Sequence, residues 1–339
     1  MRPAVGMLAA MLLLPSLLLG VATTSARAQA TAAPPAACGD TLVLAGADGV
    51  LVEPAGVTVD AFGRAWVTDA ARHRLLRFDV HGTRLDETGA LGSEVAQFRR
   101  PGALAPYGAS AMAVLDRENR RIVGYDTHAR GAQVVVDLAS PALDAAVGRV
   151  DGVSLASDVG GALYVADADR DRILVFDFSG AFQRAIGGYG SGAGAFRHLL
   201  AVASAPRGAL VTLEWLAGGK VRGKGGAPDS VRAAQVRVQW LDASGASLGH
   251  WEWPGGASAQ WSLAVDPVGA RVVVADGASG QLWQIAMAAG AQPRPLTKRT
   301  RPSAVAFSSD GALFVAEPGR LLRFAPQWDG SCEPRPLGR

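Results

Sequence analysis

The segment from Gly161 to Asp177, GALYVADADRDRILVFD, recurs in altered form along most of the chain, and this recurrence constrains the fold more than any other feature. Hydrophobic residues alternate on both sides of a polar stretch at 167–172, which is typical of two short strands joined by a turn. Four more copies lie at 64–79, 110–126, 271–286 and 312–325. Another begins at Ala209 and is separated from its partner strand, 236–242, by a long insertion. The chain therefore contains six repeats.

Each repeat carries a further short strand before this hairpin and, in most cases, another after it. The preceding strands begin at Gly56, Ala103, Gly152, Ala201, Leu263 and Ala304. The following strands include 132–139 and 247–253. Four antiparallel strands repeated around an axis form the blades of a β-propeller. We therefore predict an all-β fold, a six-bladed β-propeller of four-stranded antiparallel blades.

The repeats resemble those of the NHL-repeat family, whose members are TolB-like six-bladed β-propellers. The lead-in to the repeat is matched at Gln97–Pro101 and at 187–196, where Gly-rich sequence ends in Phe196. The hairpin is matched by Val165-Ala166-Asp167, Arg172-Ile173 and Phe176-Asp177. The match is weakest in the fourth and fifth repeats. The resemblance implies the fold, whereas function is not implied because propellers host many unrelated activities.

The first thirty residues have the organisation of a bacterial secretory signal peptide. Arg2 precedes an apolar run at 7–21, and Ala28-Gln29-Ala30 provides a small-residue cleavage site. A transmembrane anchor is the alternative, but the uninterrupted apolar run is shorter than the roughly 20 residues that a spanning helix needs. We predict an exported bacterial protein, periplasmic or secreted, with no membrane span after cleavage.

The remaining chain divides into a linker at 31–40 that contains Cys38, one propeller at 41–332, and a tail at 333–339. The last repeat has only three strands of its own, so we expect the N-terminal strand at 41–45 to be its fourth and to close the ring. This closure would bring Cys38 near Cys332. In an exported protein we expect the two to form a disulfide. Two free thiols or a metal-binding pair are the alternatives.

The charge of the chain argues against a nucleic-acid partner. The formal net charge is +3, and removal of Arg2 and Arg27 with the signal peptide lowers it to +1. A nearly neutral protein lacks the electrostatic attraction on which nucleic-acid binding depends.

The insertion at 216–234 is rich in Gly and basic residues and is expected to be a mobile excursion between the second and third strands of the fourth blade. It is either a tolerated insertion or part of a binding surface.

Every repeat ends its second strand with a carboxylate. These residues are Asp69, Asp116, Asp167, Glu214, Asp276 and Glu317. By analogy with the family's strand order, they form a ring on the blade-link face, the face on which each blade connects to the next. Such a ring could hold a cation on the propeller axis. The structural interpretation is favoured, because a carboxylate that begins a polar turn accepts backbone N–H bonds and Arg74, Arg121 and Arg172 follow as ion-pair partners.

Catalysis has little support in the sequence. Six-bladed relatives include lactonase-like calcium enzymes, virginiamycin-type lyases and amidating lyases, and the resemblance would imply Glu, Asn, Asp or His ligands on the inner strands. Those strands contain almost none here, and the five histidines fall mostly in turns or outer strands. No metalloprotease or nucleophile-elbow motif is present. We expect no cofactor, with Ca²⁺ as the alternative to test.

Tryptophan is concentrated where the repeat pattern is weakest: six of the eight fall in the fourth and fifth repeats. Trp251 and Trp253 alternate along a strand and share one face. Trp261 occupies the position of Ala55, Gly102 and Ser303 in other repeats, near the mouth of the central channel, and we match it with Asp151 in the third repeat. These four residues are the candidate binding residues. The alternative is that the tryptophans fill the layers between blades.

These observations favour a non-catalytic, exported binding scaffold that recognises a protein, peptide or glycan partner on the blade-link face. We expect a monomer. The alternative is a metal-dependent propeller enzyme, a lyase or lactonase-like protein with an axial cation. A purely structural component of the cell envelope is a further alternative.

Overall fold

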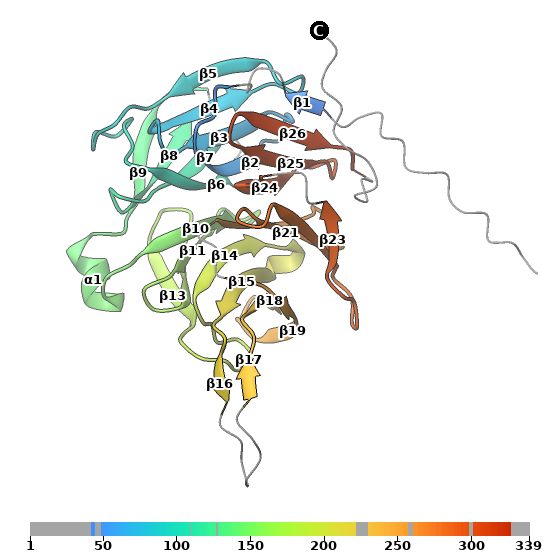
Figure 1. Ribbon diagram of the computed structural model, residues 1–339. Helices are drawn as coiled ribbons and strands as arrows, with labels where there is room; N and C mark the ends of the chain where they lie inside the picture. Colours follow the sequence, from blue (N-terminus) through green and yellow to red (C-terminus); the bar gives the residue numbers. More distant parts are fainter. Residues whose placement is uncertain are drawn as a thin grey trace, which may run out of the picture. The chain divides into compact units, whose positions relative to one another are not determined.

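The computed structural model of the chain describes residues 42–44, 49–108, 110–126, 128–221, 230–256, 260–297 and 301–326. They belong to the larger of two compact units, Ala36–Arg339. They form six four-stranded antiparallel sheets, which are the blades of a β-propeller (Figure 1). The predicted fold class is therefore confirmed. The predicted signal peptide, residues 1–30, lies outside the described residues.

Each blade runs from an inner strand at the axis to an outer strand at the rim. Blade 1 consists of β2 (Pro54–Val59), β3 (Ala65–Asp69), β4 (Arg74–Phe78) and β5 (Arg84–Thr88). Blade 2 consists of β6 (Pro101–Tyr107), β7 (Ala111–Asp116), β8 (Arg121–Asp126) and β9 (Ala132–Asp137). Blade 3 consists of β10 (Gly152–Ser157), β11 (Leu163–Asp167), β12 (Arg172–Phe176) and β13 (Phe182–Gly187).

The other three blades have the same order of strands in the sheet. In blade 4 an inserted hairpin separates the second and third strands along the chain, and in blade 6 the fourth strand comes from the N-terminal part of the chain. Blade 4 consists of β14 (Leu199–Ser204), β15 (Leu210–Leu216), β18 (Gln235–Leu241) and β19 (Ser247–Pro254). Blade 5 consists of β20 (Trp261–Val265), β21 (Arg271–Asp276), β22 (Gln281–Ala286) and β23 (Arg294–Thr297). Blade 6 consists of β24 (Ala304–Phe307), β25 (Leu313–Glu317), β26 (Arg320–Phe324) and β1 (Leu42–Leu44).

The ring is closed by the N-terminal strand, as predicted. β1 pairs antiparallel with β26, and Leu42 lies opposite Arg323 while Leu44 lies opposite Leu321. The last blade thus gains its fourth strand from the beginning of the chain, which leaves no blade with a missing outer strand. Cys38 and Cys332 lie outside the described residues, so their disulfide stays a prediction.

Small residues on the inner strands allow six strands to converge on one axis. A Cβ atom added to Gly56 would lie 2.5 Å from the Gly102 carbonyl oxygen of the next blade. Ser154 Oγ accepts a hydrogen bond from the Val202 N–H at 3.2 Å, and Ser262 Oγ accepts one from the Val305 N–H at 3.0 Å. This crowding explains why the inner strands carry so few chemically versatile side chains.

Two segments depart from the plain repeat. A short helix, α1 (Pro141–Val147), connects blades 2 and 3; Ser140 Oγ caps it by accepting the Leu143 N–H at 3.3 Å. The repeat pattern does not indicate this helix, although Ser followed by Pro is a recognised start signal. The insertion in blade 4 contributes a hairpin of β16 (Gly219–Val221) and β17 (Ser230–Arg232) between β15 and β18, where the excursion was predicted. In the described part of the chain, no helix is both long and apolar enough to cross a membrane.

The turns that join the third and fourth strands depend on a charged aspartate. In blade 3, Asp177 Oδ1 accepts hydrogen bonds from the Ser179 hydroxyl at 2.6 Å and from the Ala181 N–H at 3.0 Å. The bond from Ser179, followed by that from Ala181, lowers the pKa of Asp177 below its usual value. Asp242 and Ser244 repeat the arrangement in blade 4, with the same direction of shift.

A lowered native pKa means that this aspartate stabilises the fold above the unfolded-state pKa and loses that contribution as the pH falls through the native value. We therefore expect Asp177→Asn to lower the melting temperature at pH 7 and to have a smaller effect near pH 3. Thermal unfolding of both proteins at the two pH values measures this. An equal deficit at both would show that the charge does not matter, and Asp242→Asn provides an independent repeat.

Candidate functional site

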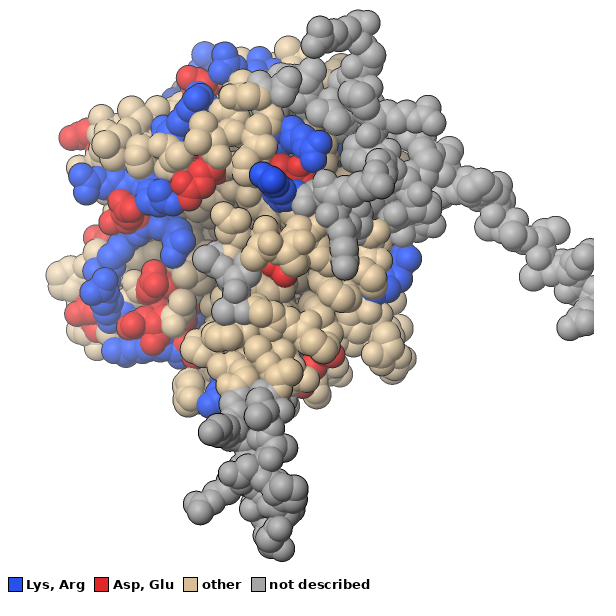
Figure 2. Space-filling model, viewed as in Figure 1, with Lys and Arg blue, Asp and Glu red and all other residues tan. Residues whose placement is uncertain are grey.

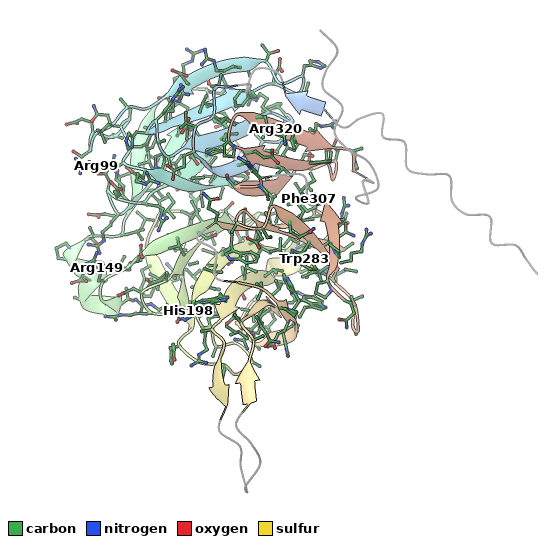
Figure 3. The ribbon with its side chains drawn as sticks, in the orientation of Figure 1. Arg99, Arg149, His198, Trp283, Phe307 and Arg320 are labelled. Carbon is green, nitrogen blue, oxygen red and sulfur yellow. The ribbon has the colours of Figure 1, made fainter. Side chains whose placement is uncertain are left out.

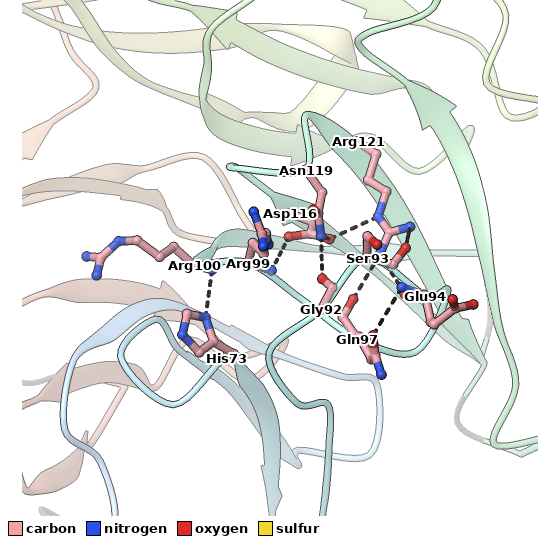
Figure 4. A network of polar contacts seen from close by, with 10 residues as sticks. All are labelled: His73, Gly92, Ser93, Glu94, Gln97, Arg99, Arg100, Asp116, Asn119 and Arg121. Atoms are coloured by element: carbon pink, nitrogen blue, oxygen red, sulfur yellow. Dashed lines mark hydrogen bonds and ion pairs between the residues drawn. The ribbon is translucent and has the colours of Figure 1, made fainter.

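The carboxylates that end the second strands are buried and bonded within their own blades. In blade 2, the Asp116 carboxylate accepts hydrogen bonds from the Arg99 N–H at 2.7 Å and from Asn119 Nδ2 at 2.7 Å, and it pairs with Arg121 Nε at 2.9 Å (Figure 4). Its side chain is fully shielded from solvent. A buried carboxylate whose hydrogen-bonding capacity is taken up by partners of its own blade and link serves the fold.

Arg121 also holds in place the segment that leads into blade 2. Its guanidinium group donates to the carbonyl oxygens of Ser93 at 2.8 Å, Glu94 at 2.7 Å and Gln97 at 2.9 Å. Just beyond, Phe98 is completely buried. The Asp116–Arg121 pair therefore fixes both the hairpin and the connection between blades, which sets the position of everything around the axial mouth.

The same pairing recurs around the ring with one exception. The ion pairs are Arg172–Asp167 at 2.8 Å, Arg237–Glu214 at 2.6 Å, Arg320–Glu317 at 2.5 Å and, more loosely, Arg74–Asp69 at 3.6 Å. In blade 5, Asp276 instead accepts from the Ala278 N–H at 3.0 Å and the Ser279 hydroxyl at 2.6 Å. Within the residues that the structure describes, no three His, Cys, Asp or Glu side chains come together as a metal site.

A pocket of about 460 Å³ opens at the mouth of the central channel on the blade-link face, and all six blades contribute to it. From blades 1 to 3 come Glu53, Pro54, Ala55, Ala70, Arg100, Pro101, Gly102, Ala103, Arg117, Glu118, Asp151, Val153 and Ala168. From blades 4 to 6 come Leu199, Leu200, Gln260, Trp261 and Ser303. Two residues singled out from the sequence, Trp261 and Asp151, therefore lie in one pocket.

The register shows how Trp261 reaches the channel. Trp261 pairs directly with Asp276, and Ser262 pairs with Ala275, without interruption. In blade 3 the register shifts between Gly152 and Ser154, so that Val153 is an extra residue in the inner strand. Blades 1, 2 and 4 shift at the same place, and blade 5 does not. A large aromatic side chain thus lies where other blades carry small or aliphatic residues.

The register also corrects one detail of the sequence alignment. By register the counterpart of Trp261, which pairs with Asp276, is Gly152, which pairs with Asp167, and the next residue, Val153, lines the channel together with Trp261. Asp151 precedes β10 and reaches the same pocket from the link, where its N–H donates to Asp167 Oδ1 at 3.0 Å. The hydrophobic pattern does not show which residue of a strand lies opposite the ring carboxylate, because a bulge leaves no mark in it.

The pocket is charged on one side and uncharged on the other. On the side of blades 1 to 3, Arg100 pairs with Glu53 and lies 3.8 Å from Glu118, while Arg117 lies 4.0 Å from Asp151. The opposite side consists of Leu199, Leu200, Gln260, Trp261 and Ser303. On the face of the molecule seen in Figure 2, charged residues gather on the left and uncharged residues dominate the lower right.

Trp251 and Trp253, the other two candidate residues, lie outside this pocket. Trp253 is 6% exposed and packs in the layer between blades 4 and 5, with its ring centroid 5.6 Å from that of Trp283. Trp251 is partly buried against the same layer. Figure 3 shows Trp283 within blade 5 and His198 at the start of blade 4. The ring centroids of His198 and Trp215 are 5.1 Å apart. Trp253 is therefore unavailable to a ligand.

Four charged residues of the pocket were not singled out from the sequence: Glu53, Arg100, Arg117 and Glu118. Glu53 and Arg100 immediately precede inner strands, and Arg117 and Glu118 immediately follow the ring carboxylate Asp116. Their positions within the repeat, directly before an inner strand or directly after a ring carboxylate, could have indicated them, since both of these positions face the axial mouth. Individually they resemble ordinary solvated turn residues.

Comparison with known proteins supports the fold and no finer assignment. No family model and no curated protein sequence matches the chain. A structure of streptogramin B lyase is 12% identical, covers 81% of this chain and 93% of that chain, and has a TM-score of 0.53. A structure of virginiamycin B lyase from Staphylococcus aureus is 11% identical, with 81% and 95% covered and a TM-score of 0.53.

A further similar structure is that of the RRP9 WD40 repeats, which is 12% identical over 84% of this chain and 97% of that chain, with a TM-score of 0.56. Lyases and WD40-repeat proteins thus resemble the chain to a similar degree. At such low identity the likeness shows a β-propeller fold alone, because propellers host many unrelated functions.

The buried pair in blade 2 generates a stability prediction. Asp116→Ala removes the charged partner of Arg121 and leaves Arg121 Nε and the Arg99 N–H without their acceptor, so we expect a loss of about 3–5 kcal/mol in the free energy of unfolding. Denaturant unfolding measures this loss. Asp169→Ala, at an exposed aspartate in the corresponding turn of blade 3, is the control and should change stability by less than about 0.5 kcal/mol. Similar effects for the two variants would contradict the anchoring role.

Proposed function

We propose that this protein is an exported, non-catalytic binding propeller that recognises a protein, peptide or glycan partner at the axial mouth of its blade-link face. The observation that carries the proposal is the pocket to which all six blades contribute and into which Trp261 extends. Concave sites with an apolar wall and a few polar groups are where proteins ordinarily bind ligands.

The surroundings of the pocket are suited to binding without rearrangement. The connections that border it in blades 2 and 4 are held by buried carboxylate–arginine pairs, Asp116–Arg121 and Glu214–Arg237. Arg237 donates to the Ser191 and Ala195 carbonyl oxygens at 2.9 Å each, as Arg121 does in its own blade. A preorganised surface loses little conformational entropy when a partner binds, and this favours affinity.

The proposed export follows from the signal-like sequence at 1–30, and it places the binding function in the periplasm or outside the cell. We propose a monomer that needs no cofactor. The partner is a macromolecule or a fragment of one, because an aromatic residue beside charged groups is a common anchor at such interfaces, and the partly buried Trp261 lines the pocket in this way.

The proposal is tested by affinity capture from an envelope extract with the mature protein. We expect the wild type to retain a specific partner and Trp261→Ala to lose it, because truncation of a central aromatic anchor commonly costs at least about 2 kcal/mol of binding. Trp251→Ala is the matched control, since it truncates a partly buried tryptophan outside the pocket. All three proteins must first be shown to be folded by thermal unfolding.

Loss of the partner in Trp261→Ala alone would support the axial site. Equal retention by both variants would place recognition on another surface and would overturn this assignment. If the wild type retains nothing, a small-molecule or enzymatic role becomes the better proposal.

The enzyme alternative, a lyase or lactonase-like protein with an axial cation, makes a separate prediction. The ring carboxylates are engaged by arginines or backbone N–H groups, so they have little capacity left for a metal ion. We expect neither excess calcium chloride nor a chelator to shift the melting temperature of the mature protein. A rise with calcium that the chelator reverses would favour the enzyme, because a bound ion stabilises the native state.

A further inference from the structure

The two sides of the axial pocket differ in chemistry, and this difference narrows the class of ligand. We infer that the pocket takes an organic cation attached to an apolar group, such as the basic side chain of a peptide next to an apolar residue. The inference rests on the proposed binding function and specifies what that function recognises.

The charged side of the pocket has an excess of negative charge. It contains three carboxylates, Glu53, Glu118 and Asp151, and two guanidinium groups, those of Arg100 and Arg117. Both arginines already have carboxylate neighbours: Arg100 lies between Glu53 and Glu118, and Arg117 lies 4.0 Å from Asp151. Among the described residues that line the pocket, one negative charge is therefore left over, and a bound cation would balance it.

Two of these carboxylates are accessible and only loosely paired. The Asp151 side chain is 59% exposed and that of Glu118 is 53% exposed, and their arginine neighbours lie at 4.0 and 3.8 Å, beyond hydrogen-bonding distance. The aliphatic part of the Arg117 side chain lies against Gly102, where an added Cβ would be 2.9 Å from Arg117 Cδ. An incoming ammonium or guanidinium group can thus reach Asp151 without breaking a close ion pair.

The opposite wall suits the apolar part of such a ligand. Trp261, Leu199 and Leu200 border the pocket there, and the structure places no charged residue among the described residues that line this side. An indole also attracts a cation that lies over its face, typically by about 0.5–1 kcal/mol at an exposed site. The volume of about 460 Å³ accommodates one or two residues of a peptide and excludes a folded domain.

An anionic ligand fits the same residues less well. To reach Arg100, an anion would have to approach Glu53 and Glu118, and to reach Arg117 it would have to approach Asp151. Like charges at such distances repel, which disfavours the wrong partner. A neutral glycan would leave the excess charge of the pocket uncompensated.

The test compares three blocked dipeptides that differ only in charge: acetyl-Leu-Arg-amide, acetyl-Leu-Gln-amide and acetyl-Leu-Glu-amide. Calorimetric titration against the mature protein should show the affinity order Arg above Gln above Glu, with at least about a 10-fold difference between the first and the last. Higher salt should reduce the preference, because exposed charges are screened.

Three variants test which residues produce the preference for the Arg peptide. Asp151→Asn should weaken binding of the Arg peptide about 2- to 5-fold, as expected for an exposed ion pair, and leave the Gln peptide unchanged. Asp144→Asn, at an exposed acid on α1 outside the pocket, is the matched control and should change neither. Trp261→Ala should weaken both peptides.

A preference for the Glu peptide, equal binding of all three, or no effect of Asp151→Asn would overturn the inference. If none of the dipeptides binds while affinity capture still depends on Trp261, the ligand class is wrong and the proposed function stands. If neither assay depends on Trp261, the proposed function fails as well.

Discussion

The buried carboxylate at the end of each blade's second strand, paired with an arginine in every blade except the fifth, is the group on which the rest of the structure depends. Asp116 shows why: its carboxylate binds the hairpin through Arg121 and the incoming link through the Arg99 N–H. Burial of a charge is tolerated only when its partners are complete. The pair joins a blade to the segment that leads into it from the previous blade. The bonds made within one turn therefore also fix how neighbouring blades are connected in the ring.

The convergence of six inner strands has a second consequence for function. Around Gly56 the strands approach so closely that even a methyl group would collide with the neighbouring backbone. Chemically versatile side chains are therefore displaced from the strands to the links and turns that surround the axis. Glu53, Arg100 and Asp151 all lie in such segments, and Trp261 begins its strand. The candidate site is a property of the mouth of the channel rather than of its interior.

The repeat pattern predicted much of this architecture and some of the site. The strands, the closure by 42–44 and the excursion in blade 4 follow from hydrophobic alternation and from the count of strands. Trp261 stood out because a large aromatic residue replaced small ones at a repeated position. Trp251 and Trp253 were selected because they share one face of a strand, but this pattern does not distinguish a face that packs between blades from one that lines a pocket.

The sequence by itself determined the fold class, the number of blades and the ring of carboxylates, because these depend on periodicity and on residue type at short range. Only the tertiary structure decided that Arg100 meets Glu53 and Glu118, that Arg117 lies near Asp151, and that Trp261 faces them across one pocket. These residues come from blades 1, 2, 3 and 5. Their proximity depends on the register of each inner strand and on bulges of a single residue, which the pattern along the chain does not encode.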